Sequence, residues 1–153
     1  MPKKLQFEPD HVDLSTVGEI NNILGFHIRL AHGAVYRHFM ETFAHLDLTQ
    51  KQASTLWLIS DNPDVAQTDI AQRLRMDRAT TMGIVNRLEK RGFVARGGSK
   101  ADRRRKTLHL TEAGARILKE AREAIWEHEK WLKSRFTQKE VNTLMALLER
   151  IHE

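Results

Sequence analysis

Residues 78–91 carry polar side chains at spacings that gather them on one side of a helix, opposite Ile84, Val85 and Leu88. Guanidinium, hydroxyl, amide and ammonium groups are the side-chain groups that contact base edges and phosphates in duplex DNA. The first turn offers Arg78, which can pair bidentately with guanine, together with Thr80 and Thr81. Asn86 and Lys90 follow further along, where the DNA backbone is the expected partner.

A second group of cations lies in residues 97–105, between two segments with the pattern of strands. Phe93–Arg96 precedes this stretch, and Lys106–Leu110 follows it with alternating polar and apolar residues. Glycine and serine make the stretch a flexible hairpin tip, and its Asp102 is expected to hold one guanidinium in place. The candidate DNA-contacting residues of the tip are Lys100, Arg103, Arg104 and Arg105.

The elements that must position these two groups follow from the flanking residues. A short helix is predicted over 68–74, and a break follows at Arg75 and Met76. Asp77 is a favourable N-cap for the second helix, and Gly92 stands where the residue after a helix end belongs. A helix-turn-helix followed by a basic β-wing is the simplest interpretation.

Charge is distributed unevenly along the chain of 153 residues, which has a net charge of +5. Residues 73–106 contain 12 Lys and Arg against 3 acidic residues, whereas the remainder has 13 basic and 17 acidic residues. Binding to a polyanion by release of counterions requires this kind of concentration. A basic face that is merely solvated is the alternative, and its coincidence with the wing pattern argues against it.

Apolar residues at three- and four-residue steps predict further helices on both sides of this region. The first is expected from a Thr16–Glu19 capping box to about residue 46, and the second from Thr49 to the break at Asn62–Pro63. Two more are expected after Thr111 and Thr137.

The apolar stripes of these outer helices exceed what a compact wing can cover, so a symmetric dimer is expected. We predict a single domain over residues 1–153, mainly α. Its dimerisation helices occupy 16–46 and 111–153, and its DNA-binding region occupies 49–110. Two recognition helices about one turn of DNA apart would match a pseudo-palindromic site.

The run IAQRLRMDRATTMGIVNRLEKRGFVARGGSKADRRRKTLHLTEAG resembles the winged-helix region of the MarR family of bacterial transcription regulators. The order of its signals carries the resemblance: Asp77 opening a helix, Arg91-Gly92-Phe93-Val94 closing it, then Asp102-Arg103-Arg104 and Leu110-Thr111-Glu112-Ala113-Gly114. The resemblance implies a winged helix-turn-helix fold and a homodimeric repressor of an operator in double-stranded DNA. Met1-Pro2-Lys3-Lys4 lacks the apolar stretch of a signal peptide, and no apolar run is long enough to span a bilayer, so we expect a cytoplasmic protein that does not bind a membrane. It also implies that a wing arginine, Arg103 or Arg104, enters the minor groove.

The chain departs from the family pattern at two neighbouring positions of the recognition helix. Met82 stands where the family often has threonine, and Gly83 stands where arginine or proline is frequent. Base contacts normally made from these two positions are therefore in doubt. Gly83 either allows a close approach of the helix backbone to the duplex or is a tolerated weakness of the helix.

Regulators of this type bind small effectors, often aromatic acids or their CoA thioesters, so the resemblance implies ligand-responsive release from DNA. Aromatic rings suit stacking on such a ligand, and cations suit its carboxylate or phosphate. Each of these side chains is equally compatible with an ordinary core or surface role. The candidate ligand-binding residues are His27, Arg29, His32, Tyr36, Arg37 and Trp57.

Other classes of function find less support. The absence of cysteine excludes disulfides, Cys-ligated zinc and thiol sensing. His27, His38 and His45 share a helix face but are separated along it by about 10 Å or more, too far for one metal shell. We therefore expect no metal, no cofactor and no catalytic residue. A zinc-sensing regulator and a winged helix that binds protein or RNA remain the alternatives.

Overall fold

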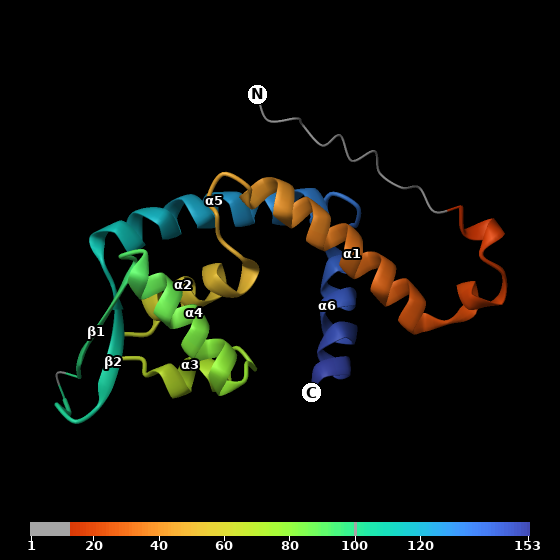
Figure 1. Ribbon diagram of the computed structural model, residues 1–153. Coiled ribbons are helices and arrows are strands. Elements are labelled where there is room, and N and C mark those ends of the chain that lie inside the picture. The colour runs from red at the N-terminus through yellow and green to blue at the C-terminus, as the bar shows by residue number, and fades with distance from the viewer. Residues whose placement is uncertain (1–12, 100) are drawn as a thin grey trace. The chain divides into compact units, whose positions relative to one another are not determined.

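The computed structural model describes residues 13–99 and 101–153. The chain divides into two compact units, residues 1–36 and 37–153, which we describe separately. Within the described ranges there are six α-helices, two short 3₁₀ helices and one antiparallel two-stranded sheet (Figure 1). The predicted class, mainly α with a small β-wing, is confirmed.

The N-terminal unit begins with two 3₁₀ helices, Leu14–Thr16 and Gly18–Asn22, followed by the first part of helix α1 (Leu24–Phe43). The prediction of one helix over 16–46 is therefore wrong at both ends, because α1 is shorter.

Local bonds explain why α1 begins late. The predicted Thr16–Glu19 capping box does not form, because Val17 precedes the second 3₁₀ helix and provides no side-chain cap. The Thr16 hydroxyl donates instead to the Asp13 carbonyl at 2.8 Å. Gly18 has a φ of +73°, a left-handed conformation that a continuous right-handed helix excludes. The chain turns at this point and enters the α-helix only at Leu24.

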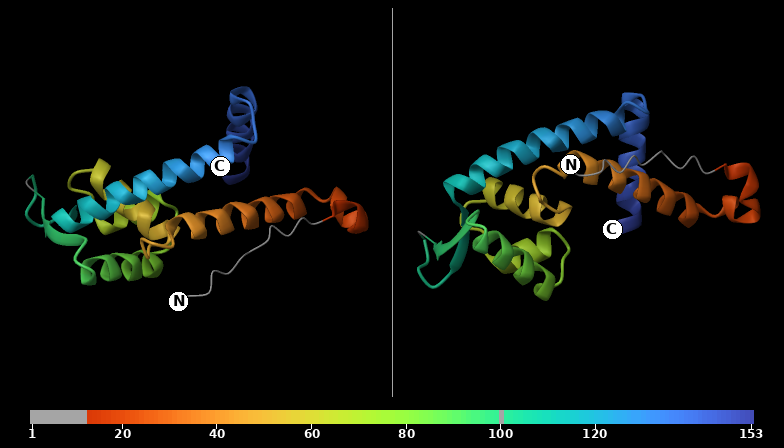
Figure 2. Two further views of the ribbon diagram at one scale, coloured as in Figure 1. Left: turned by 90° about the horizontal axis from the view of Figure 1, so that it is seen from above. Right: turned by 45° about the horizontal axis from the view of Figure 1, so that its top comes forward.

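The C-terminal unit contains the end of α1 and all the remaining elements, whose paths Figure 2 shows. One hydrophobic core is formed by residues of α1–α5, the two strands and their connections. Phe43 of α1, Leu56 of α2, Ile70 of α3 and Leu88 of α4 are almost completely buried in this core. The remaining elements are α2 (Gln50–Asp61), α3 (Gln67–Arg73), α4 (Arg78–Lys90), β1 (Val94–Gly98), β2 (Lys106–Leu110), α5 (Glu112–Lys133) and α6 (Gln138–His152).

Two helix starts have the predicted capping boxes. The Thr49 hydroxyl accepts from the Gln52 amide at 3.2 Å, and the Gln52 side chain accepts from the Thr49 amide at 3.1 Å. Thr137 and Glu140 form the same arrangement at the start of α6. The paired amides would otherwise lack partners in the first helical turn, so each box stabilises the helix start.

The turn between α3 and α4 is tight because Arg75 adopts a left-handed conformation, with a φ of 51°. The Met76 amide donates to the Ala71 carbonyl at 2.9 Å and closes the end of α3. Asp77 then caps α4 and accepts from the Thr80 amide at 2.7 Å, as predicted. The two helices are thereby fixed within a few residues of one another.

The end of α4 leads directly into the wing. Gly92 has a φ of 78°, and the Phe93 amide donates to the Leu88 carbonyl at 2.9 Å, which is a Schellman motif. Strand β1 then pairs with β2 so that Arg96 lies opposite Leu108. The predicted strand over 93–96 begins one residue later and extends two residues further.

The start of α5 packs closely on this exit from α4. The Thr111 amide donates to the Phe93 carbonyl at 3.1 Å, and the Thr111 hydroxyl donates to the Gly92 carbonyl and accepts from the Gly114 amide. A Cβ atom at Gly114 would lie 1.9 Å from the Phe93 carbonyl oxygen. Only glycine therefore fits at this position of the first turn of α5.

We expect Gly114→Ala to lower the free energy of unfolding by about 3 kcal/mol, because the added methyl group overlaps backbone atoms that cannot rotate away. Urea denaturation at fixed protein concentration measures the loss. Ala115→Gly is the matched control in the next position and should cost only about 1 kcal/mol of helix propensity. Equal losses in the two variants would contradict the packing explanation.

Within the C-terminal unit, two histidines join the end of α1 to α5. His38 Nδ1 lies 2.8 Å from His128 Nδ1, and the ring of Trp131 stacks on His38 at a centroid distance of 3.9 Å. His128 is only 7% exposed. Burial lowers the pKa of both imidazoles. The pKa of His38 is also raised by Glu41 and lowered by Arg135, but burial outweighs both. The pKa of His128 is lowered further by His38 and raised by Glu129.

This pair should make the folded chain less stable as the pH falls. In the folded chain the pKa values of both histidines lie below the ordinary 6.5. In the pH window between these lowered values and 6.5, the unfolded chain therefore binds more protons than the folded chain. The contribution is complete above pH 6.5 and is lost as the pH decreases through that window. Urea titrations at a series of pH values should show a smaller slope for His128→Gln, and an unchanged slope would contradict this assignment.

Candidate nucleic-acid interface

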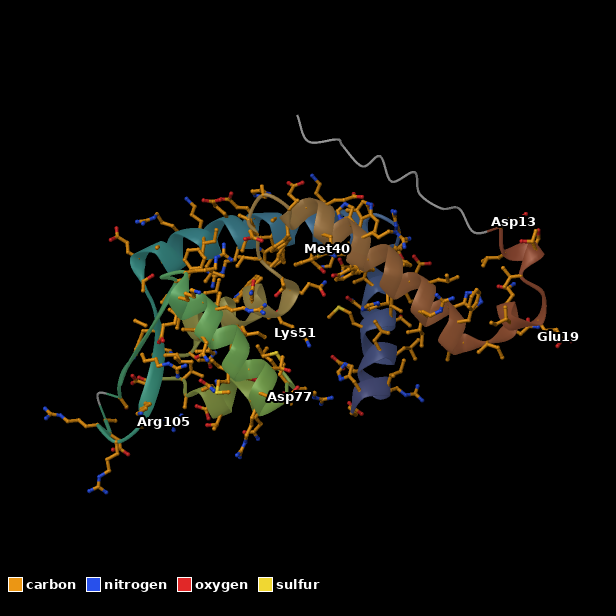
Figure 3. All side chains as sticks on the ribbon, viewed as in Figure 1. Asp13, Glu19, Met40, Lys51, Asp77 and Arg105 are labelled. Atoms are coloured by element: carbon orange, nitrogen blue, oxygen red, sulfur yellow. The ribbon has the colours of Figure 1, made fainter. Side chains whose placement is uncertain are left out.

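Helix α4 is held by one buried side, which leaves the other side exposed. Thr81, Val85 and Leu88 are fully buried against the core. Of the predicted contact residues, Arg78, Asn86 and Lys90 are exposed. Figure 3 marks the start of this helix at Asp77. The structure therefore presents these three polar side chains to solvent, as a DNA-contacting helix requires.

The two threonines of the first turn do not share this exposure. Thr81 is 0% exposed, and its hydroxyl donates to the Asp77 carbonyl at 2.8 Å. We therefore remove Thr81 from the candidate contacts, because a side chain without accessible surface cannot reach a base or a phosphate. The Thr80 hydroxyl donates to the Asp77 carboxylate at 2.6 Å, and the hydrogen bonds from Thr80 lower the Asp77 pKa. Thr80 is partly exposed and remains a candidate.

Arg96 of β1 connects the wing to both helices of the helix-turn-helix. Its guanidinium donates to Glu89 at 3.1 Å and to Asn86 at 2.9 Å, both in α4, and to Gln67 of α3 at 3.1 Å. Arg96 could not be predicted from the sequence, because no local pattern relates a strand position to a helix residue 29 positions away, as Gln67 is. Arg96 orients the Asn86 amide and sets the angle of the wing.

The wing contains two kinds of arginine. Arg105 forms an ion pair with Asp69 of α3 and so ties the end of the hairpin loop to that helix. Figure 3 labels Arg105 near the hairpin tip. Arg103 and Arg104 are exposed, and neither guanidinium has an ion-pair partner among the residues that the structure describes. These two side chains are available to a polyanion.

The hairpin tip contains two further residues of the prediction, Asp102 and Lys100. Asp102 was expected to hold a guanidinium, but its carboxylate accepts from the Arg104 backbone amide at 2.9 Å and its carbonyl accepts from the Arg105 amide at 3.1 Å. This correction makes Asp102 a turn-forming residue, a usual role for aspartate. The predicted contact residue Lys100 lies outside the described residues.

The predicted ligand-binding residues fall in both units. In the N-terminal unit, the Arg29 guanidinium lies over the Phe26 ring at 5.3 Å, and the His32 ring stacks on Tyr36 at 6.2 Å. The ring nitrogen of His27 lies 2.6 Å from the Asn21 carbonyl oxygen.

In the C-terminal unit, Arg37 is exposed. Trp57 lies edge-on to Trp126 at 6.2 Å, with the Arg122 guanidinium over its ring at 4.9 Å. Trp57 is thus already packed against α5, and the sequence analysis did not anticipate these two neighbours.

Metal binding gains no support from the described part of the chain. Across residues 13–99 and 101–153, no three His, Asp or Glu side chains gather as a set of metal ligands. In the same residues, no helix is both long and apolar enough to span a membrane.

The arrangement of α3, α4 and the β-wing is that of a winged helix-turn-helix DNA-binding protein. Comparison with known proteins identifies the family: residues 46–105 match a model described as "MarR family". A putative transcriptional regulatory protein for the hcr operon of Thauera aromatica is 31% identical over 98% of this chain and 92% of its own length. The chain belongs to the MarR family of transcriptional regulators, whose members are DNA-binding proteins and not enzymes.

Solved structures agree with this assignment. The repressor CouR, bound to a 23-mer DNA duplex, is 31% identical, with a TM-score of 0.81 over 90% of this chain and 97% of that chain. CouR from Rhodococcus jostii RHA1, bound to p-coumaroyl-CoA, is 24% identical, with a TM-score of 0.79 over 88% of this chain and 94% of that chain. The second comparison concerns the fold alone.

Proposed function

We propose that this regulator is a homodimeric repressor that holds a pseudo-palindromic operator and leaves it when a small aromatic effector binds. The observation that carries the proposal is the set of exposed cations on α4 and the wing. They lie within a segment of 12 basic and 3 acidic residues in a chain whose remainder has more acids than bases. Such a patch attracts DNA, and the winged fold gives the patch its shape.

Each exposed residue has a role that follows from its position. Arg78, at the start of α4, enters the major groove and pairs with guanine, while Thr80 lies beside it. Lys90, near the end of α4, contacts a phosphate. Asn86 is held by Arg96 and faces the DNA backbone.

The wing supplies the minor-groove contacts. Arg103 and Arg104 are free to enter a narrow groove, where the negative potential is strongest. Arg105 is paired with Asp69, so its role is to support the hairpin and not to bind a base. Lys100 completes the proposed phosphate contacts of the tip.

Dimerisation follows from the apolar surface of α6. Leu144, Met145, Leu147, Leu148 and Ile151 are 40–64% exposed on this one helix. A row of large apolar side chains on a single face is favourable to bury, at about 25 cal/mol per Å². We assign the helices within 16–46 and 111–153 to a twofold dimer interface. This interface sets the distance between the two α4 helices, which belong to the proposed DNA-binding region 49–110 of each chain.

The effector is proposed to be an aromatic carboxylate or an aromatic acyl-CoA. Two local features support this class: a guanidinium over an aromatic ring at Arg29, and stacked rings at His32 and Tyr36. The p-coumaroyl-CoA of the R. jostii CouR structure is a ligand of this chemistry. The residues proposed to contact the effector remain His27, Arg29, His32, Tyr36, Arg37 and Trp57.

The first test selects bound sequences from random duplex and measures the mass of the complex by light scattering. We expect two chains per selected duplex, recovery of an inverted repeat, and affinity that decreases steeply with salt. Random duplex should bind at least about a thousandfold more weakly. A monomeric complex, or equal retention of selected and random duplex, would refute the proposal.

The second test adds candidate effectors to the complex with the selected duplex. Benzoate, p-coumarate and p-coumaroyl-CoA are the probes, and fluorescence anisotropy of labelled duplex reports release. We expect at least one of them to release the DNA. An effector suffices if it favours, by a few kcal/mol, a dimer in which the spacing of the two α4 helices no longer matches the operator. Release by none of the three would contradict the proposed effector class.

The third test concerns the wing. We expect Arg103→Ala and Arg104→Ala each to weaken operator binding by about 1–3 kcal/mol, because each removes a guanidinium from the duplex. The matched control is Arg116→Ala in α5, an exposed arginine that pairs with Glu112 in its own helix. Unchanged affinity in both wing variants, measured in the same anisotropy assay, would show that the wing does not contact DNA.

A further inference from the structure

The side of α4 opposite its buried side carries small residues in its first half instead of polar ones. Steps of about 100° per residue place Ala79, Gly83, Asn86 and Lys90 in one row, opposite the buried Thr81 and Leu88. The cation and the amide occupy the later half of this row. The early half, which penetrates the major groove deepest, consists of Ala79 and Gly83.

No contact among the residues that the structure describes requires glycine at position 83. A Cβ atom built there meets no atom within 4 Å, in contrast to the overlap at Gly114. Its φ is not among the left-handed values of the chain, so any residue fits the backbone. Glycine is among the poorest helix formers, so this residue weakens α4 without any gain in packing.

The neighbouring residue is equally unusual for a surface that binds a polyanion. Met82 is 51% exposed and is the large apolar side chain presented by α4. Arg78 precedes it by one helical turn, and Lys90 follows two turns later. An apolar group is thus placed among the cations of this helix, with Arg78 before it and Arg87 and Lys90 after it.

We propose that Ala79, Met82 and Gly83 form an apolar notch that reads the C5-methyl group of thymine in the major groove. The missing side chain at Gly83 lets the helix backbone approach the base edges, and Met82 covers the methyl group from the side. Among the four bases, only thymine presents an apolar group in this groove. The inference rests on the proposed DNA binding and specifies one A·T pair in each half-site.

The test replaces thymine by uracil, which removes only the methyl group. Each thymine of the selected duplex is replaced in turn, symmetrically in both half-sites. We expect one position at which the affinity of the wild-type protein decreases roughly tenfold. This is the loss expected when two methyl groups, one in each half-site, are no longer buried in the interface. In Met82→Gln, which keeps the side-chain length but is polar, thymine and uracil duplexes should bind equally.

Two further variants distinguish a contact with the thymine methyl group from a general loss of DNA binding. Gly83→Ala should raise the urea midpoint of the free protein, because alanine favours helix, and should weaken binding to the selected duplex. Lys90→Ala is the control: it should weaken binding to thymine and uracil duplexes by the same factor.

The outcomes distinguish the two proposals. A selected duplex that binds equally well with uracil at every position would overturn the notch and leave the DNA-binding function intact. Gly83→Ala with higher stability and undiminished affinity would likewise overturn it, since the glycine would then be a mere weakness of the helix. Failure to recover any preferred duplex would overturn the proposed function and the notch together.

Discussion

The close approach of α5 to the Phe93 carbonyl is the constraint on which the rest of this structure depends. At this one point the end of α4, the start of the wing and the start of α5 meet, because Thr111 bonds to both Gly92 and Phe93. The space left for Gly114 admits no side chain. Helix α4, the hairpin and the long helix α5 are therefore held together at their junction, in addition to the core that they share.

The positive charge of the DNA-binding region is divided between structure and function. Arg105 pairs with Asp69, and Arg96 bonds to three side chains of α3 and α4. These arginines tie the wing to the helices at the cost of some freedom to bind phosphate. Arg103, Arg104 and Lys90 retain that freedom. A count of cations from composition thus overstates the charge that is available to a polyanion.

The local features of the fold could be predicted from the sequence, because the residues concerned act within a few positions. Asp77, Gly92 and the Thr49–Gln52 box are examples, since each satisfies backbone groups of its own helix end. The sequence could not reveal that Thr81 is buried or that Arg96 holds Asn86, since both depend on elements that meet only after folding. The late start of α1 was missed because Gly18 and Asp13 outweighed the apolar periodicity.

The left-handed Arg75 has a consequence for how the protein tolerates change. A branched side chain such as valine is strongly disfavoured in this conformation, whereas glycine or asparagine adopts it readily. A replacement of this kind in the turn between α3 and α4 would disturb the direction of α4 through the backbone alone. Some harmful substitutions in this chain should therefore be recognisable by backbone geometry instead of by charge.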